Sequence, residues 1–461
     1  PHRPWVDAVK VSCTECGTAV SRIKDVGNPW LDAGIVPFST LGYRNDKDYW
    51  KEGFPADWIS ESFPGQFRNW FYSLLTMGAA LENTESFRTV FSYALMRDEK
   101  GEDMHKSKGN AIWFDDAAEE MGVDAMRWLY ARQNPTANLN FGYGTADEVR
   151  RRFLIPLWNV YSFFVTYANI DSFDPTASEV ASSSSEMDRW ILSELHSLVA
   201  DVTRHLDDYD SADAGRGMEE FVDLLSNWYV RRSRRRFWKS ENDQDKLAAY
   251  HTLHTCLVTL SKLLAPFTPF IAEEMYQNLV RSANPEAPES VHLASYPMAD
   301  PMQIDNSLSQ AMRLAMKVSS LGRSARSKAG IKVRQSLSRV LVKPRIAEET
   351  AMLERVSPQI LDELNVKEIS LLEKEEDVLD FQVRLNPSVA GAKYGPEMSK
   401  IDSALMKADA TTIALRVRSG LTVEVEGYTI QPDEITVTYS DRPGYASATE
   451  AGYMIAIPTE L

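Results

Sequence analysis

A lysine-bearing loop carries the clearest chemistry in this chain. Lys106 lies in the segment 97–110, within the tetrapeptide Met104-His105-Lys106-Ser107. An apolar, strand-like run at 89–96 precedes this segment, and a helix-like run begins at Asp115. A lysine on a loop at the carboxyl end of a strand is well placed to bring its positive charge to a nucleotide phosphate, as phosphoryl and nucleotidyl transfer require. The loop therefore predicts a nucleotide site; the alternative is a solvated turn with scattered charge.

A basic strip at 229–239 is the second stretch whose residue types point to chemistry. It reads Tyr-Val-Arg-Arg-Ser-Arg-Arg-Arg-Phe-Trp-Lys, with six cations and no acid. Guanidinium groups pair with phosphates and stack on unstacked bases, and aromatic rings also stack on bases. The strip predicts an RNA-binding helix with these candidate contacts: Trp228, Arg231, Arg232, Arg235 and Arg236. The alternative that stays open is a solvated face whose arginines pair with Glu219, Glu220 and Asp223.

Two cysteines and two histidines have the spacing of metal ligands. Cys13 and Cys16 form half of a tetrahedral zinc site, which needs four ligands. Cys256 lies within a helical pattern and is a poor third ligand. His251 and His254 lie in the middle of a helical pattern that has no glycine, so we interpret them as structural. Three cysteines cannot form a disulfide framework, and they favour a reducing, cytoplasmic location.

Length and composition are those of an ordinary globular protein. With 461 residues the chain has room for about three domains. Its net charge of −16 argues against a general nucleic-acid binder, but an acidic body with one basic strip fits a protein that holds a specific polyanion. No apolar run approaches the roughly 18 residues of a membrane span, so we expect no membrane association. The chain does not begin with Met and its last residues read as an unfinished strand, so both ends look truncated.

The order of the predicted elements gives the fold class. Residues 1–145 alternate short strands with helices, which is typical of an α/β layer. Residues 146–300 have apolar side chains at helical spacing and predict an all-α bundle, with Asp188 as the cap of one helix. Residues 301–461 predict an incomplete α+β domain. The individual expectations are strands at 9–12 and 89–96, helices at 70–81, 188–199, 218–238, 247–264 and 271–280, then a helix at 305–329 and strands at 340–343, 421–430 and 453–461.

The lysine loop resembles the Lys-Met-Ser-Lys-Ser signature of class I aminoacyl-tRNA synthetases, and its continuation to Leu129 is similar to the same family. Within this class the chain looks like an isoleucyl-tRNA synthetase from just after its editing insertion onward. Leucyl and valyl relatives share the loop and the bundle but fit residues 2–38 less well. The resemblance covers nearly the whole chain. It rests on the segments His2–Asp7, Cys13–Gly17, Pro29–Phe38, Asn227–Trp238, Leu264–Glu274, Arg326–Arg334 and Glu363–Glu368.

The resemblance implies an enzyme that condenses isoleucine with ATP, accompanied by Mg²⁺, to isoleucyl-adenylate and then transfers the acyl group to tRNA. Residues 1–145 would be the second half of a Rossmann-like nucleotide-binding domain, and residues 146–300 the anticodon-binding domain. Lys106 aligns with the catalytic lysine that contacts the ATP phosphates, and its neighbours Met104, His105 and Ser107 align with the rest of the ATP-binding signature. Asp103 stands where the family has its first lysine, so a carboxylate is expected beside a polyanionic substrate.

The resemblance also assigns Glu61, Gln66 and Trp70 to the aminoacyl-adenylate site. A tryptophan wall suits a branched aliphatic side chain, because one methylene contributes only about 1–3 kcal/mol and the pocket must be tightly shaped. The alternative is that Gln66 is a helix cap and Trp70 belongs to the core.

The family also has an early His-x-Gly-His motif that grips ATP, and none of the seven histidines here has that arrangement. The chain alone is therefore expected to be inactive. The resemblance further implies a cytoplasmic monomer, and a zinc site completed by a second cysteine pair upstream of residue 1. The other class of function that stays open is a synthetase-derived tRNA-binding or regulatory protein without catalysis.

Overall fold

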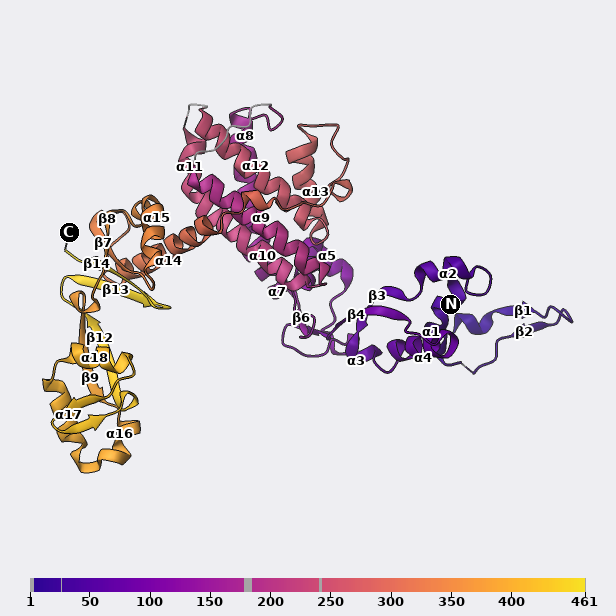
Figure 1. Ribbon diagram of the computed structural model, residues 1–461. Coiled ribbons are helices and arrows are strands. Elements are labelled where there is room, and N and C mark those ends of the chain that lie inside the picture. The colour runs from indigo at the N-terminus through magenta and orange to yellow at the C-terminus, as the bar shows by residue number, and fades with distance from the viewer. Residues whose placement is uncertain (1–3, 26, 178–184, 240–242, 461) are drawn as a thin grey trace. The chain divides into compact units, whose positions relative to one another are not determined.

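The computed structural model describes residues 4–25, 27–177, 185–239 and 243–460 (Figure 1). His2 and Arg3 of the first motif lie outside the described residues. The chain divides into two units, Pro1–Ile304 and Asp305–Leu461. The α/β and all-α parts share the first unit, and the α+β part forms the second. The finer domain bounds of 1–145, 146–300 and 301–461 stay predictions.

The first unit opens with α/β elements, as expected (Figure 1). β3 and β4 pair in parallel, with Ile59 opposite Val90. The crossover helix α4 buries Phe71 and Leu74 in one cluster with Ile59. It begins at Trp70, as predicted. The elements are β1 (Lys10–Ser12), β2 (Ala19–Ser21), α1 (Pro29–Thr40), α2 (Lys47–Gly53), β3 (Ala56–Ser62), α3 (Phe63–Gln66), α4 (Trp70–Glu82) and β4 (Phe87–Tyr93).

The single strand expected at 89–96 is wrong, because the run contains parts of two strands. β4 ends at Tyr93, and β5 (Met96–Asp98) pairs in parallel with β6 (Leu139–Phe141) instead of with β3. Between the two strands, the Ala94 N–H donates to the carbonyl of Pro135 at 2.8 Å, so the chain changes partners there. The elements that follow are η2 (Lys106–Lys108), α5 (Phe114–Met121), α6 (Val123–Ala131) and α7 (Tyr143–Val149).

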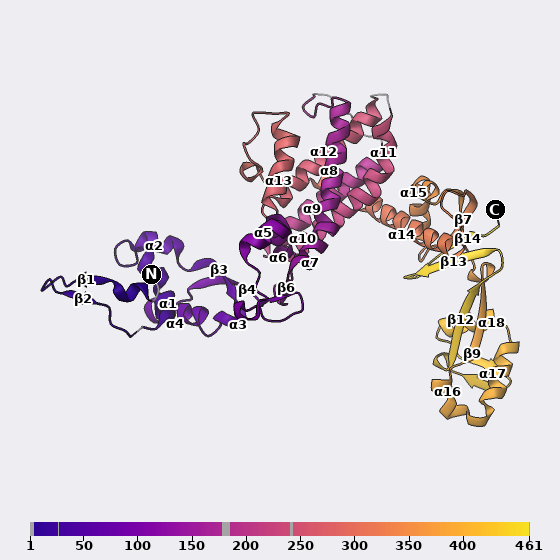
Figure 2. The same cartoon turned by 180° about the vertical axis from the view of Figure 1, so that it is seen from behind.

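The rest of the first unit is the expected helical bundle, whose helices α8, α9, α10 and α12 lie together in both views (Figures 1 and 2). Apolar residues spaced along α9, among them Trp190, Ile191 and Leu195, are buried, which confirms the predicted apolar face. The elements are η3 (Arg150–Leu154), α8 (Ile155–Ile170), α9 (Glu186–Asp207), α10 (Ser211–Leu224), η4 (Leu225–Val230), α11 (Arg231–Trp238), α12 (Gln244–Leu264), α13 (Pro269–Tyr276), η5 (Gln277–Arg281), η6 (Val291–Leu293) and η7 (Pro301–Gln303).

The expected capping role of Asp188 is wrong. Helix α9 begins at Glu186, so Asp188 lies inside its first turn, and its side chain is fully buried. It accepts hydrogen bonds from Tyr229 and Arg236 of the neighbouring helical segment. A buried carboxylate needs such partners, because an unpaired charge in the interior is strongly unfavourable.

One helical stretch in the described residues, Tyr143–Ile170, is long and apolar enough to cross a membrane by length and composition alone. The sequence expectation had found no such stretch. Phe153, Leu157 and Phe164 of this stretch are buried within the bundle. Core helices of soluble proteins pass the same test, and 33% of the apolar window of this stretch is buried.

The second unit is α+β, as expected. Helix α14 (Asn306–Lys328) begins after Asp305, whose side chain accepts a hydrogen bond from the Leu308 N–H. A four-stranded sheet has the order β13-β14-β7-β8, with α15 as the crossover between the parallel strands β7 and β8. The remaining elements are β7 (Leu337–Lys343), α15 (Glu348–Leu364), β8 (Val366–Leu371), η8 (Glu375–Asp377), β9 (Leu379–Leu385), α16 (Pro387–Tyr394), η9 (Gly395–Glu397), α17 (Met398–Lys407), α18 (Ala410–Arg418), β10 (Val423–Val425), β11 (Tyr428–Ile430), η10 (Pro432–Glu434), β12 (Ile435–Asp441), β13 (Tyr445–Glu450) and β14 (Tyr453–Pro458).

Two expectations about strands in this unit are corrected. The run 421–430 is a hairpin and not one strand, because Glu426 and Gly427 have φ values of 47° and 84° and turn the chain between β10 and β11. The strand expected at 453–461 is β14, which ends at Pro458. In the sheet, β14 lies between β13 and β7.

Candidate nucleotide site and nucleic-acid interface

The lysine loop is held at both ends by hydrogen bonds of Asp98 and Asn110. The Asp98 carboxylate accepts from the backbone N–H groups of Lys100 and Glu102 at 3.0 and 2.9 Å. It also accepts from the Asn110 amide at 2.9 Å, and the Asn110 oxygen accepts from the His105 N–H at 2.9 Å. The Asn110 hydrogen bond and the two backbone bonds lower the pKa of Asp98. The loop therefore has a defined base although most of its side chains are exposed.

Lys106 is exposed at the start of the short helix η2. Its Nζ lies 4.6 Å from the ring centroid of Trp113, which is itself exposed. A cation over an aromatic ring at an exposed site is held by only about 0.5–1 kcal/mol, so an anionic ligand can displace this contact. The other residues of the signature differ in exposure. His105 and Ser107 are exposed, whereas Met104 packs on the core cluster that contains Met121.

Asp103 has a partner in the structure that the sequence did not indicate. Its Oδ1 lies 3.5 Å from Nε of Arg97, and the two residues form a backbone bridge at the base of the loop. Arg97 also donates to the carbonyl of Gly101 at 3.0 Å. The carboxylate at the position of the first lysine of the signature therefore faces an arginine, which partly offsets its negative charge.

The second candidate group lies where β3 passes into α3 and α4. A carboxylate oxygen of Glu61 accepts from the Ser62 N–H at 2.9 Å and from the Tyr93 hydroxyl at 3.4 Å. Gln66 accepts from the Trp70 N–H at 3.4 Å, and Trp70 packs half-buried on the core of this region. This geometry matches the alternative in which Gln66 is a cap and Trp70 is core, and it also brings both residues to the carboxyl end of β3. Within residues 27–177, no described hydrogen bond or ion pair joins the three residues to Lys106.

Cys13 and Cys16 lie in the tight turn between β1 and β2, where the Gly17 N–H donates to the Cys13 carbonyl at 2.9 Å. Cys16 is exposed, and its hydrogen bond to the Thr18 hydroxyl lowers its pKa. Cys256 is fully buried in α12, and burial raises its pKa. The turn presents two thiols, and among the described residues no third His, Cys, Asp or Glu lies close enough to share a metal ion with them, whereas a tetrahedral zinc site needs four ligands.

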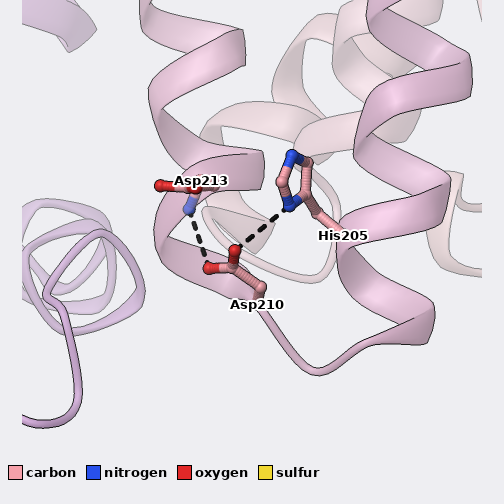
Figure 3. A group of neighbouring side chains, drawn as sticks. All are labelled: His205, Asp210 and Asp213. Atoms are coloured by element: carbon pink, nitrogen blue, oxygen red, sulfur yellow. Dashed lines mark hydrogen bonds and ion pairs between the residues drawn. The ribbon is translucent and has the colours of Figure 1, made fainter.

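A group that sequence reasoning missed joins His205, Asp210 and Asp213 between α9 and α10 (Figure 3). The His205 Nδ1 lies 3.1 Å from Asp210, which also accepts from the Asp213 N–H at 3.0 Å (Figure 3). The guanidinium groups of Arg204 and Arg216 lie 2.9 Å from His205 and 2.7 Å from Asp213. Helix capping and these neighbouring cations account for the group without a metal ion.

Two motif segments far apart in sequence meet where α6 contacts α13. Arg127 donates to the carbonyls of Phe267 and Pro266 at 2.9 and 2.8 Å. Asp124 accepts from the Ile271 N–H at 2.7 Å, and its pKa is raised by burial. Each segment carries part of the resemblance, and their contact joins the α/β part of the unit to the bundle.

The structure separates the basic strip into buried and exposed members. Trp228 is buried, and the guanidinium of Arg232 lies 5.1 Å from its ring centroid. Arg236 forms two hydrogen bonds with Asp188, at 2.6 and 2.8 Å, and its side chain is 15% exposed. Trp228 and Arg236 are thus parts of the bundle interior, whereas Arg231 and Arg235 are exposed.

Two of the three acids expected to neutralise the strip have other partners. Glu219 accepts from the Trp128 indole at 2.9 Å and pairs with Arg132, and Asp223 accepts from Asn227 at 2.6 Å. The buried acid that the strip does meet is Asp188. Burial by itself would lower the pKa of Arg236, but the ion pair with Asp188 raises it above its usual value.

Two family models match this chain. The model described as tRNA synthetases class I (I, L, M and V) matches residues 5–142, and the model described as the anticodon-binding domain of tRNA ligase matches residues 188–341. The first covers the α/β part with its lysine loop, and the second covers the bundle with its basic strip. The matched regions are those of a class I tRNA synthetase with an anticodon-binding domain.

Curated relatives narrow the family. The chain is 51% identical over 377 residues to isoleucine–tRNA ligase of Dehalococcoides mccartyi. The aligned region covers 81% of this chain and 37% of the relative. The ligase of Thermus thermophilus is 42% identical, and the alignment covers 100% of this chain and 45% of that ligase. The ligase of Clostridium acetobutylicum is 40% identical, and the alignment covers 100% of this chain and 44% of that ligase. The chain is a homologue of the isoleucine–tRNA ligases, and it spans less than half the length of these relatives.

Proposed function

We propose that this chain serves the attachment of isoleucine to its tRNA through an isoleucyl-adenylate formed from ATP and Mg²⁺. Lys106, with Met104, His105 and Ser107, would bind the ATP phosphates, and Glu61, Gln66 and Trp70 would shape the adenylate site. The observation that carries the proposal is an exposed lysine on a loop whose base is fixed by Asp98 and Asn110. Such a loop places a charge near the phosphates while leaving the ammonium able to follow them into the transition state.

The proposal is tested with Lys106→Met in the full-length gene product, by isoleucine-dependent exchange of pyrophosphate into ATP. We expect kcat of exchange to fall by at least 100-fold, while KM for isoleucine changes little, because the charge acts mainly in the transition state. Lys108→Met, two residues along the same loop, is the matched control and should change exchange much less. Equal losses in kcat and in isoleucine binding would contradict a transition-state role. The chain alone, purified free of host enzyme, should show no exchange.

We also propose that the helical part of the first unit holds tRNA. Its support is the match to an anticodon-binding domain together with the exposed arginines of the basic strip. The exposed arginines Arg231 and Arg235 are the proposed contacts. Arg232 is partly buried against Trp228, and Trp228 and Arg236 stabilise the helix that presents the exposed arginines. The remaining assignments are proposals of the same kind: a cytoplasmic monomer, and zinc bound by Cys13 and Cys16 with two ligands from outside this chain.

A second candidate function is a synthetase-derived protein that binds tRNA without catalysis. The absence of His-x-Gly-His among the seven histidines of the sequence favours it for this chain taken alone. The two functions are separated by the exchange assay on the full-length gene product: tRNA binding without any exchange would support the second function over the first.

A further inference from the structure

The turn that opens the lysine loop is tied to a helix by the side chain of Glu99. This residue follows β5, and Gly142 follows β6. Because β5 and β6 pair in parallel, the residues that follow the two strands lie next to each other. There the Glu99 carboxylate accepts hydrogen bonds from the backbone N–H groups of Gly144 and Thr145, at 2.5 and 3.1 Å. Glu99 therefore caps the N-terminus of α7, which Gly142 cannot do because it has no side chain.

Helix α7 is a firm anchor for this turn. It continues through η3 into α8 as one helical stretch of 28 residues. Ala146 of α7 is fully buried in an apolar cluster with Phe141, and Met104 of the lysine loop packs on the same cluster. The first turn of α7 has no acidic residue of its own, so the Glu99 carboxylate supplies the negative charge that the N-terminus of a helix favours. The loop is thus attached to α7 by one polar and one apolar side chain.

The close approach of Glu99 to α7 depends on two glycines. A Cβ atom added to Gly142 or to Gly144 would lie closer than 3.0 Å to side-chain atoms of Glu99. An alanine at either position would therefore push the carboxylate away. The φ of Gly142 is 172°, which is extended backbone open to any residue, so glycine is needed there for space and not for its conformation.

We propose that Glu99 is a positioning residue for Lys106: its carboxylate fixes the start of the lysine loop to α7 and so sets where the ammonium group meets the nucleotide phosphates. This inference rests on the proposed function, in which Lys106 acts on ATP. Asp98 and Asn110 close the loop on itself, whereas Glu99 attaches it to a neighbouring helix. A charge that is displaced from the reacting atoms loses much of its effect on the transition state. Loss of the contact should therefore lower kcat and leave KM for isoleucine nearly unchanged.

The first measurement is amide hydrogen exchange, in the chain itself, of peptides that span residues 97–110. Loss of an N-terminal cap changes an equilibrium by a factor of about 2–30, so the loop in Glu99→Ala should exchange faster by about that factor. Gly142→Ala should have the same effect without changing the loop sequence, because its methyl group displaces the carboxylate. Combining the two substitutions should add nothing, since the space is then free. Glu99→Gln keeps an oxygen acceptor and should loosen the loop less.

The matched control is Glu102→Ala. Glu102 lies in the same loop and is exposed, as Glu99 is, so neither substitution removes a side chain from the core. In the described part of the first unit, the Glu102 side chain makes no hydrogen bond or ion pair. Its replacement removes the same charge from the loop and should leave both exchange of the loop and kcat unchanged. Peptides of the second unit are the internal reference.

The second measurement is isoleucine-dependent exchange of pyrophosphate into ATP by the full-length gene product. Glu99→Ala and Gly142→Ala should each lower kcat by about 2- to 30-fold, and Glu99→Gln should lower it less. In a Lys106→Met background, Glu99→Ala should cause no further loss, because a residue that acts only through Lys106 then has nothing to position. A residue needed only for folding would lower activity by the same factor in both backgrounds.

The outcomes separate the inference from the function on which it rests. If the unsubstituted gene product shows no exchange of pyrophosphate, the proposed function is overturned, and hydrogen exchange of the loop alone decides whether Glu99 holds it to α7. If the loop in Glu99→Ala and Gly142→Ala exchanges like that of Glu102→Ala, Glu99 does not hold the loop and the inference is overturned. The inference is also overturned if the loop loosens at unchanged kcat, or if Glu99→Ala costs the same factor with and without Lys106.

Discussion

Replacing Arg236 with methionine should destabilise the bundle, whereas the same change at Arg235 should not. The Asp188 carboxylate is fully buried and accepts two hydrogen bonds from Arg236, at 2.6 and 2.8 Å, and one from the Tyr229 hydroxyl at 2.7 Å. Methionine fills similar space but donates no hydrogen bond, so the Asp188 carboxylate would lose both of its hydrogen bonds with Arg236. Removing one partner of a buried ion pair costs about 3–5 kcal/mol. Arg235 is exposed, and its replacement should stay within about 0.5 kcal/mol.

Amide hydrogen exchange followed by mass spectrometry measures this difference locally, which matters because a chain of several domains does not unfold in a single two-state step. At about 1.4 kcal/mol per factor of ten, exchange in peptides from α9, α11 and α12 should be more than 100-fold faster in Arg236→Met than in Arg235→Met. Peptides of the second unit are the internal reference. Adding Asp188→Leu to Arg236→Met should recover most of the protection, because the buried carboxylate that lost its partner is then removed as well. Equal protection in the two single variants would refute the argument that Asp188 and Arg236 stabilise the bundle as a pair.

Three further predictions follow from the geometry. Asp98→Asn should speed trypsin cleavage within the lysine loop several-fold, because it weakens the hydrogen bonds that fix the base of the loop. The control Asp103→Asn should change the cleavage rate little. Equal cleavage rates in the two variants would show that Asp98 does not hold the loop. Burial lowers the pKa of His254, so its contribution to stability is complete above the unfolded pKa of about 6.5 and is lost as pH falls below it. The protection of bundle amides from hydrogen exchange should therefore drop between pH 7.5 and 5.5, and the drop should be smaller in His254→Gln. A drop of the same size in the variant would show that other titratable groups cause it. A thiol reagent should modify exposed Cys16 first and buried Cys256 only after denaturation, which mass spectrometry of the labelled peptides would check.

Much of the fold follows from local patterns. The helical spacing of apolar residues in α9 and α12 predicted the bundle because this signal depends on residues a few positions apart. The strand expectations failed where the outcome depended on distant partners. The run 89–96 divides because the residues after Tyr93 bond to Pro135 and Leu139, more than 40 positions along the chain, and the run 421–430 turns back at Glu426 and Gly427.

In the candidate site, too, local patterns were readable from the sequence and contacts between separate segments were not. The identity and order of the residues around Lys106 were enough to indicate a nucleotide loop and its family, because that signature is contiguous. The partner of Asp103 could not be read from the signature, since Arg97 reaches it only once the loop closes back on β5.

For the basic strip, the sequence by itself determined that one helix carries five arginines and that they could not all face the core. Only the tertiary structure decided which of them are exposed and which belong to the interior of the bundle. The π-helical turn η4 shifts the helical phase just before α11, and Asp188, which holds Arg236, lies 48 residues earlier in the chain. The direction in which each side chain points is set by that buried ion pair and by the packing of Phe237, which are interactions between helices and leave no periodic signal in the strip itself.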